Sequence, residues 1–108
     1  MNFENVMINA LAHTGAAAFN SGPVNFGYAG LLSGVVMIEN GLNQNVSVQL
    51  QARPREGATW QNVETASVVA AGGTGNIATT TPWPEVRITC TPAGAVASGT
   101  FSAWWCGV

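Results

Sequence analysis

Charged residues are scarce in this chain of 108 residues. They make up 7% of it, where roughly a quarter is typical of soluble proteins. Lysine and aspartate are missing altogether, which leaves three arginines and five glutamates, beside one histidine. Because the net charge is −2 and the arginines form no basic stripe, binding to nucleic acid by phosphate neutralisation is not expected.

The shortage of charge admits two interpretations. Protein interfaces are depleted in charged residues, so other subunits could cover much of the surface. The alternative is a small neutral extracellular domain that its Asn, Gln, Ser and Thr side chains keep in solution. We favour the first interpretation, because a solitary soluble protein usually carries more charge.

Long hydrophobic runs are missing as well. The longest apolar stretch, residues 30–38, is interrupted by Ser33 and Gly34 and is too short to span a bilayer as a helix. The N-terminus lacks the positive region of a secretory signal. Unless the chain is a processed product, we expect it to be made and kept in a cytoplasm, with no membrane as partner.

Cysteine is limited to Cys90 and Cys106, which admit a single disulfide. A cytoplasmic chain would keep both thiols reduced, and alternation places Cys90 on the inward face of its strand and Cys106 on the outward face of the last one. A β-bulge could reverse this, so the pairing stays open. Two cysteines without supporting histidines make no zinc site, and no cofactor is expected.

The sequence does contain clear strand patterns. Residues 46–53 carry apolar side chains at every even position, and a period of two places them on one face of a half-buried antiparallel strand. Pro54 and Gly57 end this strand and turn the chain. Residues 60–70 are expected to return as the second strand of a hairpin, with Trp60 over its base.

Further strands are expected at residues 5–10, 30–39, 86–91 and 99–106. The β-branched run at 30–39 is expected to be buried on both faces and to join the hairpin in a three-stranded meander, through a tight turn at Asn40-Gly41. Residues 71–76 predict a flexible loop. Pro82 and Pro84 are expected to present the ring of Trp83 from a loop.

These elements predict an all-β fold class, as an antiparallel β-sandwich or a jelly-roll-like barrel in a single domain. Residues 1–29 would form an N-terminal strand and an irregular arm or loop region, and residues 30–108 the body of the sandwich. The same N-terminal residues would also suit an extended arm that lies on a neighbouring subunit.

No pattern for catalysis stands out. His13 lies in the weakly patterned start of the chain, where we expect it to be exposed to solvent, and no nucleophile motif surrounds a serine. The five glutamates lack the setting of paired glycosidase carboxylates, and Glu85 and Arg87 are expected to share a solvated face. The glycines at 72–75 lack the lysine and the helix of a phosphate loop. The chain is therefore expected not to be an enzyme.

Two tryptophans are the best candidates for binding. With Phe101, Ala103 and Trp105 inward on the last strand, Trp104 faces outward. Trp104 near a loop-borne Trp83 could stack on a sugar or fill a hydrophobic pocket in a partner subunit, and cover by the chain's own loops is the third possibility. The other candidate interface residues are Tyr28, Arg53 and Arg55.

Four stretches of the sequence carry a resemblance to a known class of proteins. They are Val46-Ser47-Val48-Gln49-Leu50-Gln51, Arg55-Glu56-Gly57-Ala58-Thr59-Trp60, Glu85-Val86-Arg87-Ile88-Thr89 and Gly99-Thr100-Phe101-Ser102-Ala103-Trp104. Between residues 46 and 105 the chain resembles small β-sandwich proteins encoded in tailed-phage virion modules. It departs from that pattern at Glu56, where an Asp is expected before the turn glycine.

The resemblance implies a non-enzymatic structural role on a bacteriophage virion, such as a capsid decoration (cement) protein or a small head or tail component. Together with the low charge, this role leads us to expect a homo-oligomer, for instance a trimer, made in the host cytoplasm, whose other partner is the major capsid protein or another virion protein. No catalytic residue is carried over. The alternative left open is a carbohydrate-binding, adhesin-like module that binds a glycan through Trp83 and Trp104.

Overall fold

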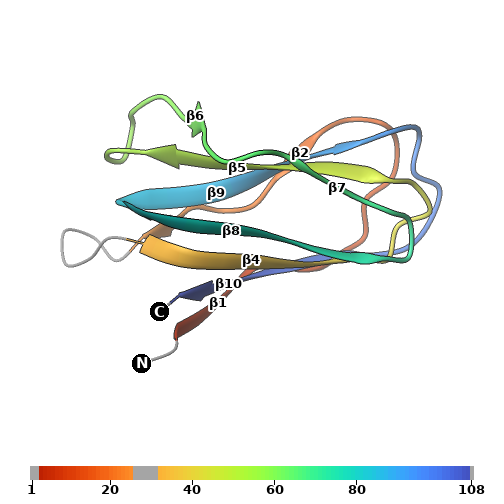
Figure 1. Ribbon diagram of the computed structural model, residues 1–108. Coiled ribbons are helices and arrows are strands. Elements are labelled where there is room, and N and C mark those ends of the chain that lie inside the picture. Colours follow the sequence, from red (N-terminus) through yellow and green to blue (C-terminus); the bar gives the residue numbers. More distant parts are fainter. Residues whose placement is uncertain (1–2, 26–31, 108) are drawn as a thin grey trace.

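The computed structural model describes residues 3–25 and 32–107, and all the regular structure in these two ranges is β-strand (Figure 1). The strands are β1 (Phe3–Leu11), β2 (Phe19–Asn20), β3 (Val24–Asn25), β4 (Leu32–Asn40), β5 (Val46–Arg53), β6 (Gln61–Asn62), β7 (Ser67–Val69), β8 (Thr74–Trp83), β9 (Glu85–Pro92) and β10 (Phe101–Gly107). Within these ranges, no helix is long and apolar enough to cross a bilayer.

The strands form two antiparallel sheets that pack face to face, so the predicted all-β sandwich is confirmed (Figure 1). The first sheet has the order β1-β10-β4-β8, and the second has the order β2-β9-β5-β6, with β3 also on β9 and β7 also on β5. If β2 with β3 and β6 with β7 each count as one interrupted strand, both sheets have four strands. Eight strands in two such sheets are the arrangement of a jelly roll.

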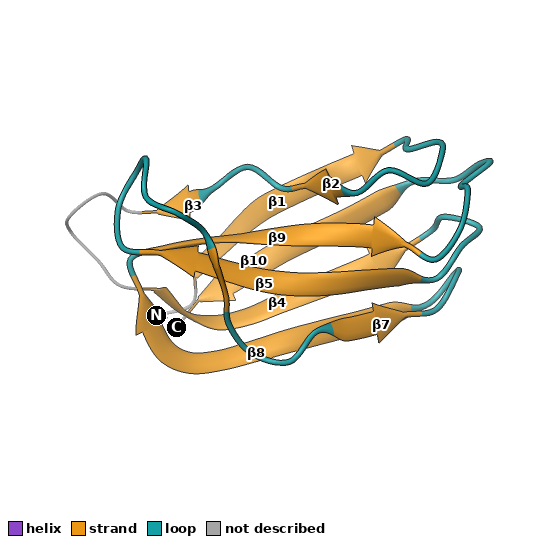
Figure 2. Cartoon of the chain, turned by 90° about the horizontal axis from the view of Figure 1, so that it is seen from above, coloured by secondary structure: helices purple, strands orange, loops and turns teal. Residues whose placement is uncertain are grey.

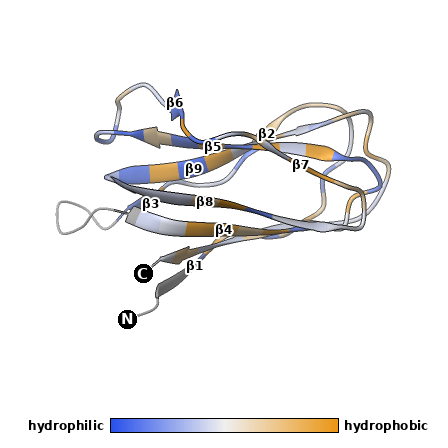
Figure 3. Ribbon diagram, viewed as in Figure 1, coloured by the Kyte–Doolittle hydropathy of each residue, from blue (hydrophilic) through white to orange (hydrophobic). Residues whose placement is uncertain are grey.

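The core lies between the sheets and follows from the two-residue period of the strands. Val46, Val48 and Leu50 are fully buried on β5, while the residues between them are half-buried on the other face. Strand β9 shows the same alternation as bands of hydropathy (Figure 3). Phe101 on β10 closes one end of the core, where its ring meets Phe19 edge to face, with centroids 5.2 Å apart.

The predicted meander is wrong, because β4 and β5 lie in different sheets. Asn40 makes a buried corner between them and not an exposed tight turn. Its Nδ2 donates to the carbonyl oxygens of Gln44 and Val69 at 3.0 Å, and its Oδ1 accepts from the backbone N–H of Leu42 at 3.1 Å. These bonds satisfy backbone groups that would otherwise be unpaired where the chain crosses from one sheet to the other.

The expectation that residues 30–39 are buried on both faces is also wrong for the described part of that run. Val36 and Ile38 are fully buried, whereas Met37 between them is 44% exposed. The reason is that the second sheet covers only one face of β4, and the other face is the outside of the sandwich.

Strand β8 replaces most of the predicted loop before and around Trp83. It begins at Thr74 and runs to Trp83, paired with β4 from Glu39 to Leu32. A proline at position 82 is tolerated because β8 is the outer strand of its sheet, where one side of the backbone has no ladder to complete. Trp83 is therefore presented from the end of a strand and not from a loop.

The predicted hairpin at 46–70 is confirmed in its pairing, although its return strand is interrupted. Both β6 and β7 pair with β5, at Gln51–Ala52 and at Val46–Val48 respectively. In the gap, the Gln49 side chain donates to the carbonyl oxygens of Val63 and Glu64. The Gln49 side chain thus replaces some of the backbone hydrogen bonds that are missing between β6 and β7.

The described N-terminal residues pack on their own sandwich. Strand β1 pairs with β10, and β2 and β3 run along β9 (Figure 2). The expected first strand at 5–10 is confirmed and extends from Phe3 to Leu11. The expected boundary between residues 29 and 30 lies outside the described residues and stays a prediction.

Candidate functional site

The outer face of the first sheet carries a row of apolar side chains on three neighbouring strands. Val6 on β1 pairs with Trp104 on β10, and Trp104 pairs with Met37 on β4. Val6 is 51% exposed and Met37 44%, while Trp104 between them is half-buried. The next outward positions on β10 and β4 are Cys106 and Val35, which also pair with each other. We call these five residues the apolar face.

Strand alternation creates this face, since Phe101, Ala103 and Trp105 are fully buried on the opposite side of β10. Glu39 is the one charged side chain that the structure describes on this side of the sheet, and it lies near the end of β4. Contiguous exposed apolar residues without charge are typical of surfaces that meet another protein.

The two cysteines lie on different sheets and are both free. Cys90 is buried on the inner face of β9, where burial raises the pKa of its thiol to about 12. Cys106 is half-buried on the apolar face. The disulfide that the sequence left open is therefore not formed.

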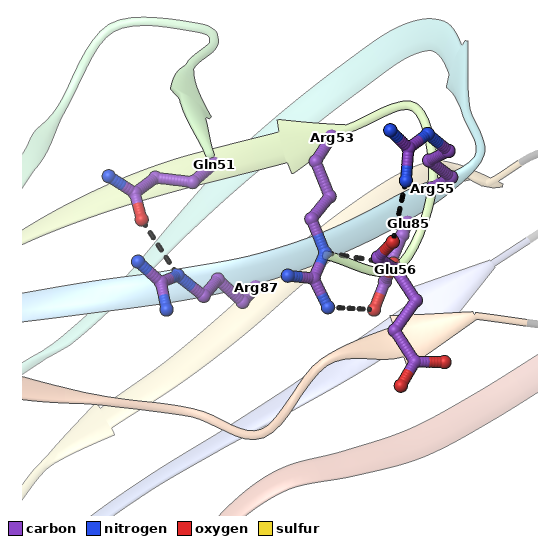
Figure 4. A network of polar contacts seen from close by, with 6 residues as sticks. All are labelled: Gln51, Arg53, Arg55, Glu56, Glu85 and Arg87. Atoms are coloured by element: carbon purple, nitrogen blue, oxygen red, sulfur yellow. Dashed lines mark hydrogen bonds and ion pairs between the residues drawn. The ribbon is translucent and has the colours of Figure 1, made fainter. Parts of the chain in front are cut away.

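A polar cluster occupies the opposite side of the sandwich, at the end of the second sheet where β5 ends and β9 begins (Figure 4). Arg53 and Glu85 pair across the two strands, and Nε and Nη2 of Arg53 each donate to a carboxylate oxygen of Glu85 at 3.0 Å. These hydrogen bonds from Arg53 hold the pKa of Glu85 below its ordinary value, against the opposing effect of burial. The same contact raises the pKa of Arg53.

Arg87 lies beside this pair on β9. Its Nε donates to Oε1 of Gln51 at 2.8 Å, and Gln51 in turn donates to Oδ1 of Asn62 at 2.9 Å. The ring of Trp60 stacks on both arginines, with the Cζ atoms of Arg53 and Arg87 at 4.2 Å and 4.5 Å from its centroid. Burial, and then the charge of Arg53, lower the pKa of Arg87. We call Gln51, Arg53, Trp60, Glu85 and Arg87 the arginine cluster.

A pocket of about 210 Å³ opens next to the arginine cluster. Its lining is mostly apolar and consists of Ala52, Arg53, Pro54, Gln61, Val63, Trp83 and Pro84. Trp83 is fixed in this wall because its Nε1 donates to Oγ1 of Thr79 at 3.0 Å, and Thr79 donates to the Glu64 carboxylate at 2.7 Å. We call this hollow the Trp83 pocket.

The structure separates the two tryptophans that the sequence analysis considered together. Trp104 lies on the apolar face, and Trp83 lies at the end of β8 against the core, so no single site contains both rings. Arg53 belongs to the arginine cluster and also lines the pocket. Arg55 is exposed and donates to the backbone carbonyl of Glu56, whose carboxylate points away from it (Figure 4). Tyr28 lies outside the described residues.

Two further expectations need correction, those on Glu85 with Arg87 and on His13, and the one on Trp60 gains detail. Glu85 and Arg87 do not share a solvated face, because Glu85 is only 3% exposed and pairs with Arg53. Trp60 directly precedes the returning strand β6, and the structure adds that its ring lies against two guanidinium groups. His13 is not fully solvated, since its Nε2–H donates to the Ala17 carbonyl and its ring packs at 4.5 Å from that of Phe19.

Sequence reasoning missed Met37 and Val6 as surface-forming residues, and it placed Arg87 on the surface without including it among the candidate binding residues. For Arg87 a signal existed, since it alternates with the inward Val86 and Ile88. For Met37 the sequence contained no such signal, because Val35 to Ile38 is an unbroken apolar run in which no alternation marks the outward positions. Among the described residues, no group of three or more His, Cys, Asp or Glu side chains could hold a metal ion.

No protein-family model matches the chain, and no curated protein matches its sequence. Solved structures do match its fold. PirA aligns with a TM-score of 0.58 at 15% identity, over 96% of this chain and 91% of PirA. The structure of the infectious bursal disease virus Gx strain aligns with a TM-score of 0.56 at 11% identity, over 99% of this chain and 31% of the viral chain.

A third match is a GH29 fucosidase of Ruminococcus gnavus in complex with fucose, with a TM-score of 0.58 at 20% identity. It covers 92% of this chain and 19% of the fucosidase, so this chain spans about a fifth of that enzyme and about a third of the viral protein. At these identities the matches show the fold alone. The chain is thus an all-β sandwich of a kind that also occurs in a virus particle.

Proposed function

We propose that this chain is a non-enzymatic structural protein of a tailed-phage virion, most specifically a capsid decoration protein. It self-associates and stabilises neighbouring subunits of the capsid. The observation that carries the proposal is the apolar face, where Val6, Trp104 and Met37 form one uncharged row across three strands. Burial of such a row against another subunit removes apolar area from water, which is the main favourable term in protein association.

The distribution of charge supports the same function. The three arginines all lie at the end of the second sheet or in the turn that follows it, away from the apolar face. The five residues of the apolar face carry no charge themselves, so they can be buried against another subunit without leaving one of their own side chains as an unpaired ion. The likeness to a viral structure supports the architecture, while the resemblance to phage virion proteins supports the particular role and a location on the virion after synthesis in the host cytoplasm.

Self-association can be tested on the purified protein by light scattering. The proposal predicts a mass above 11.1 kDa for the wild-type chain and a return toward 11.1 kDa for Met37→Glu, which places a charge in the middle of the face. Val68→Glu is the matched control, because Val68 is 69% exposed and lies on the other sheet. It should assemble as the wild type does.

The role on a particle is tested by labelling of intact virions with an antibody against the purified protein. Labelling of the capsid surface supports the proposal. A chain that is monomeric at all concentrations and missing from particles would overturn it. Turnover of a substrate that disappears when His13 or a glutamate is changed would overturn its non-enzymatic part.

The Trp83 pocket favours a second function, that of a carbohydrate-binding module. An aromatic wall beside polar groups can bind a sugar, because the C–H groups of the sugar ring pack on the aromatic ring and its hydroxyls form hydrogen bonds with the polar groups. A glycan array tests it with Trp83→Ala and, as a matched control, Trp104→Ala, which lies on the apolar face of the same sheet and outside the pocket. Loss of binding only in Trp83→Ala, with both variants folded by circular dichroism, supports this function. Binding that survives in Trp83→Ala would overturn it.

A further inference from the structure

The positive charge of the arginine cluster is only partly neutralised. Arg53 and Glu85 cancel each other through two hydrogen bonds. Arg87 is half-buried, and among the described residues it forms no ion pair. Its charge is thus held in place without a carboxylate partner in the described part of the chain.

The geometry of Arg87 leaves a specific part of its guanidinium for a ligand. Its Nε is taken by Gln51, and its plane lies against Trp60, while no described residue accepts from its two terminal amino groups. Two neighbouring N–H donors on a rigid plane match the two oxygens of a carboxylate or of a sulfate. Gln51 and Trp60 restrict the orientation of this donor pair before any ligand arrives, which reduces the entropy lost on binding.

The Trp83 pocket is connected to the arginine cluster through Arg53, which belongs to both. Arg53 stacks on the same indole as Arg87 and also lines the pocket, and Gln61 in the pocket wall follows Trp60 in the sequence. A volume of about 210 Å³ is enough for one sugar ring of a longer saccharide. The site therefore combines a ring-sized hollow with a neighbouring anchor for an oxyanion.

We propose that the arginine cluster and the Trp83 pocket together bind an acidic saccharide. Its carboxylate or sulfate accepts from the terminal amino groups of Arg87, and its ring lies in the pocket against Trp83. This inference rests on the carbohydrate-binding function proposed above and narrows it to sugars that carry an oxyanion.

Tryptophan fluorescence provides the test, because Trp60 and Trp83 both border the site. The probes are a galacturonate trisaccharide, a sulfated galactose oligosaccharide and a neutral galactose oligosaccharide of the same length. The expected result is a saturable fluorescence change with at least one acidic probe, which weakens as salt is raised. The acidic probe that binds identifies the oxyanion.

The variants assign the binding to Arg87. Arg87→Gln should weaken binding of the acidic probe about tenfold or more, and Arg87→Lys should restore only part of it, because lysine lacks the planar pair of donors. Arg55→Gln is the matched control, since it removes the same charge at the same end of the molecule but outside the cluster. Thermal unfolding establishes that each variant is folded.

The outcomes separate this inference from the function on which it rests. Acidic binding that is lost in Arg87→Gln and kept in Arg55→Gln supports it. Equal binding of the neutral probe, or equal losses in the two variants, overturns it and leaves carbohydrate binding standing. If no saccharide binds at millimolar concentration, both this inference and the carbohydrate-binding function are overturned.

Discussion

Arg53 and Glu85 face each other on β5 and β9, and two parallel hydrogen bonds of 3.0 Å join them. The pair lies at the sheet surface, yet its side chains are only 13% and 4% exposed. Because Arg53 lowers the pKa of Glu85, the ionised carboxylate favours the folded chain over the unfolded one. This ion pair therefore stabilises the pairing of β5 with β9, the two central strands of the second sheet.

A prediction about pH follows from this pair. In the unfolded chain Glu85 has its ordinary pKa of 4.5, and in the folded chain the pKa is lower. The unfolded state consequently takes up the proton first as the pH falls. The stabilisation by Glu85 is complete well above pH 4.5 and is lost as the pH falls through the lowered, folded-state pKa.

Glu85→Gln should therefore unfold at a lower urea concentration than the wild type at pH 7, and the difference should narrow toward pH 3. Urea unfolding at a series of pH values measures this. Glu56→Gln, in an exposed turn, is the control and should follow the wild type. A deficit in Glu85→Gln that does not change with pH would contradict the charge-based account.

Gly99 provides a prediction about backbone geometry. Its φ of +103° is in the left-handed region, and a Cβ at this position would meet the carbonyl oxygen of Gly41. Gly99→Ala should therefore destabilise the protein by more than about 1 kcal/mol. Gly22→Ala is the matched control, because its Cβ would point into open space. Urea midpoints of the two variants check this, and equal midpoints would refute the steric argument.

The sequence could predict the strands whose two faces differ. In residues 46–53 and 86–91 every second side chain is apolar, so the period of two determines both the strand and its buried face. The inward Phe101, Ala103 and Trp105 follow by the same rule. This information is local, because it depends only on neighbours in the chain.

Contacts between residues that are far apart in the sequence could not be predicted in the same way. Nothing near Asn40 in the sequence indicates that its side chain will bond to the carbonyl of Val69, 29 residues later. Likewise β1 pairs with β10, at the other end of the chain. Such contacts depend on how the whole chain packs. At Asn40-Gly41 this packing overrides the local preference for a tight turn and produces a corner between the two sheets.

For the candidate sites too, what depends on neighbours in the chain could be predicted, and what depends on distant strands could not. The outward position of Trp104 was predictable from alternation, but its neighbours Val6 and Met37 were not, because they come from distant strands. The stacking of Trp60 on Arg53 and Arg87 depends on the approach of β9 to β5. The residue types were visible in the sequence, and only the fold brings them together.

Ile88 tests the core directly. It is fully buried on β9 and lies opposite Leu50 on β5. Ile88→Ala removes buried methyl groups and leaves a cavity, which should lower the free energy of unfolding by about 2–5 kcal/mol. The adjacent Thr89 points to the outer face and is half-buried, so Thr89→Ala should have a much smaller effect. Urea unfolding measures both, and similar losses would contradict the assigned faces of β9.

The two thiols provide the last prediction. Cys90 is fully buried and its pKa is raised to about 12, so almost no reactive thiolate forms at neutral pH. Cys106 is half-buried on the apolar face and is open to reagents. A maleimide should therefore label one cysteine per native wild-type chain at pH 7 and none in native Cys106→Ser. In urea it should label both cysteines of the wild type.

Labelling of Cys106 should also slow as the protein concentration is raised, because the proposed self-association covers the face on which Cys106 lies. Rapid native labelling of Cys106→Ser would show that β9 opens, and a rate at Cys106 that is independent of concentration would place the contact between subunits elsewhere.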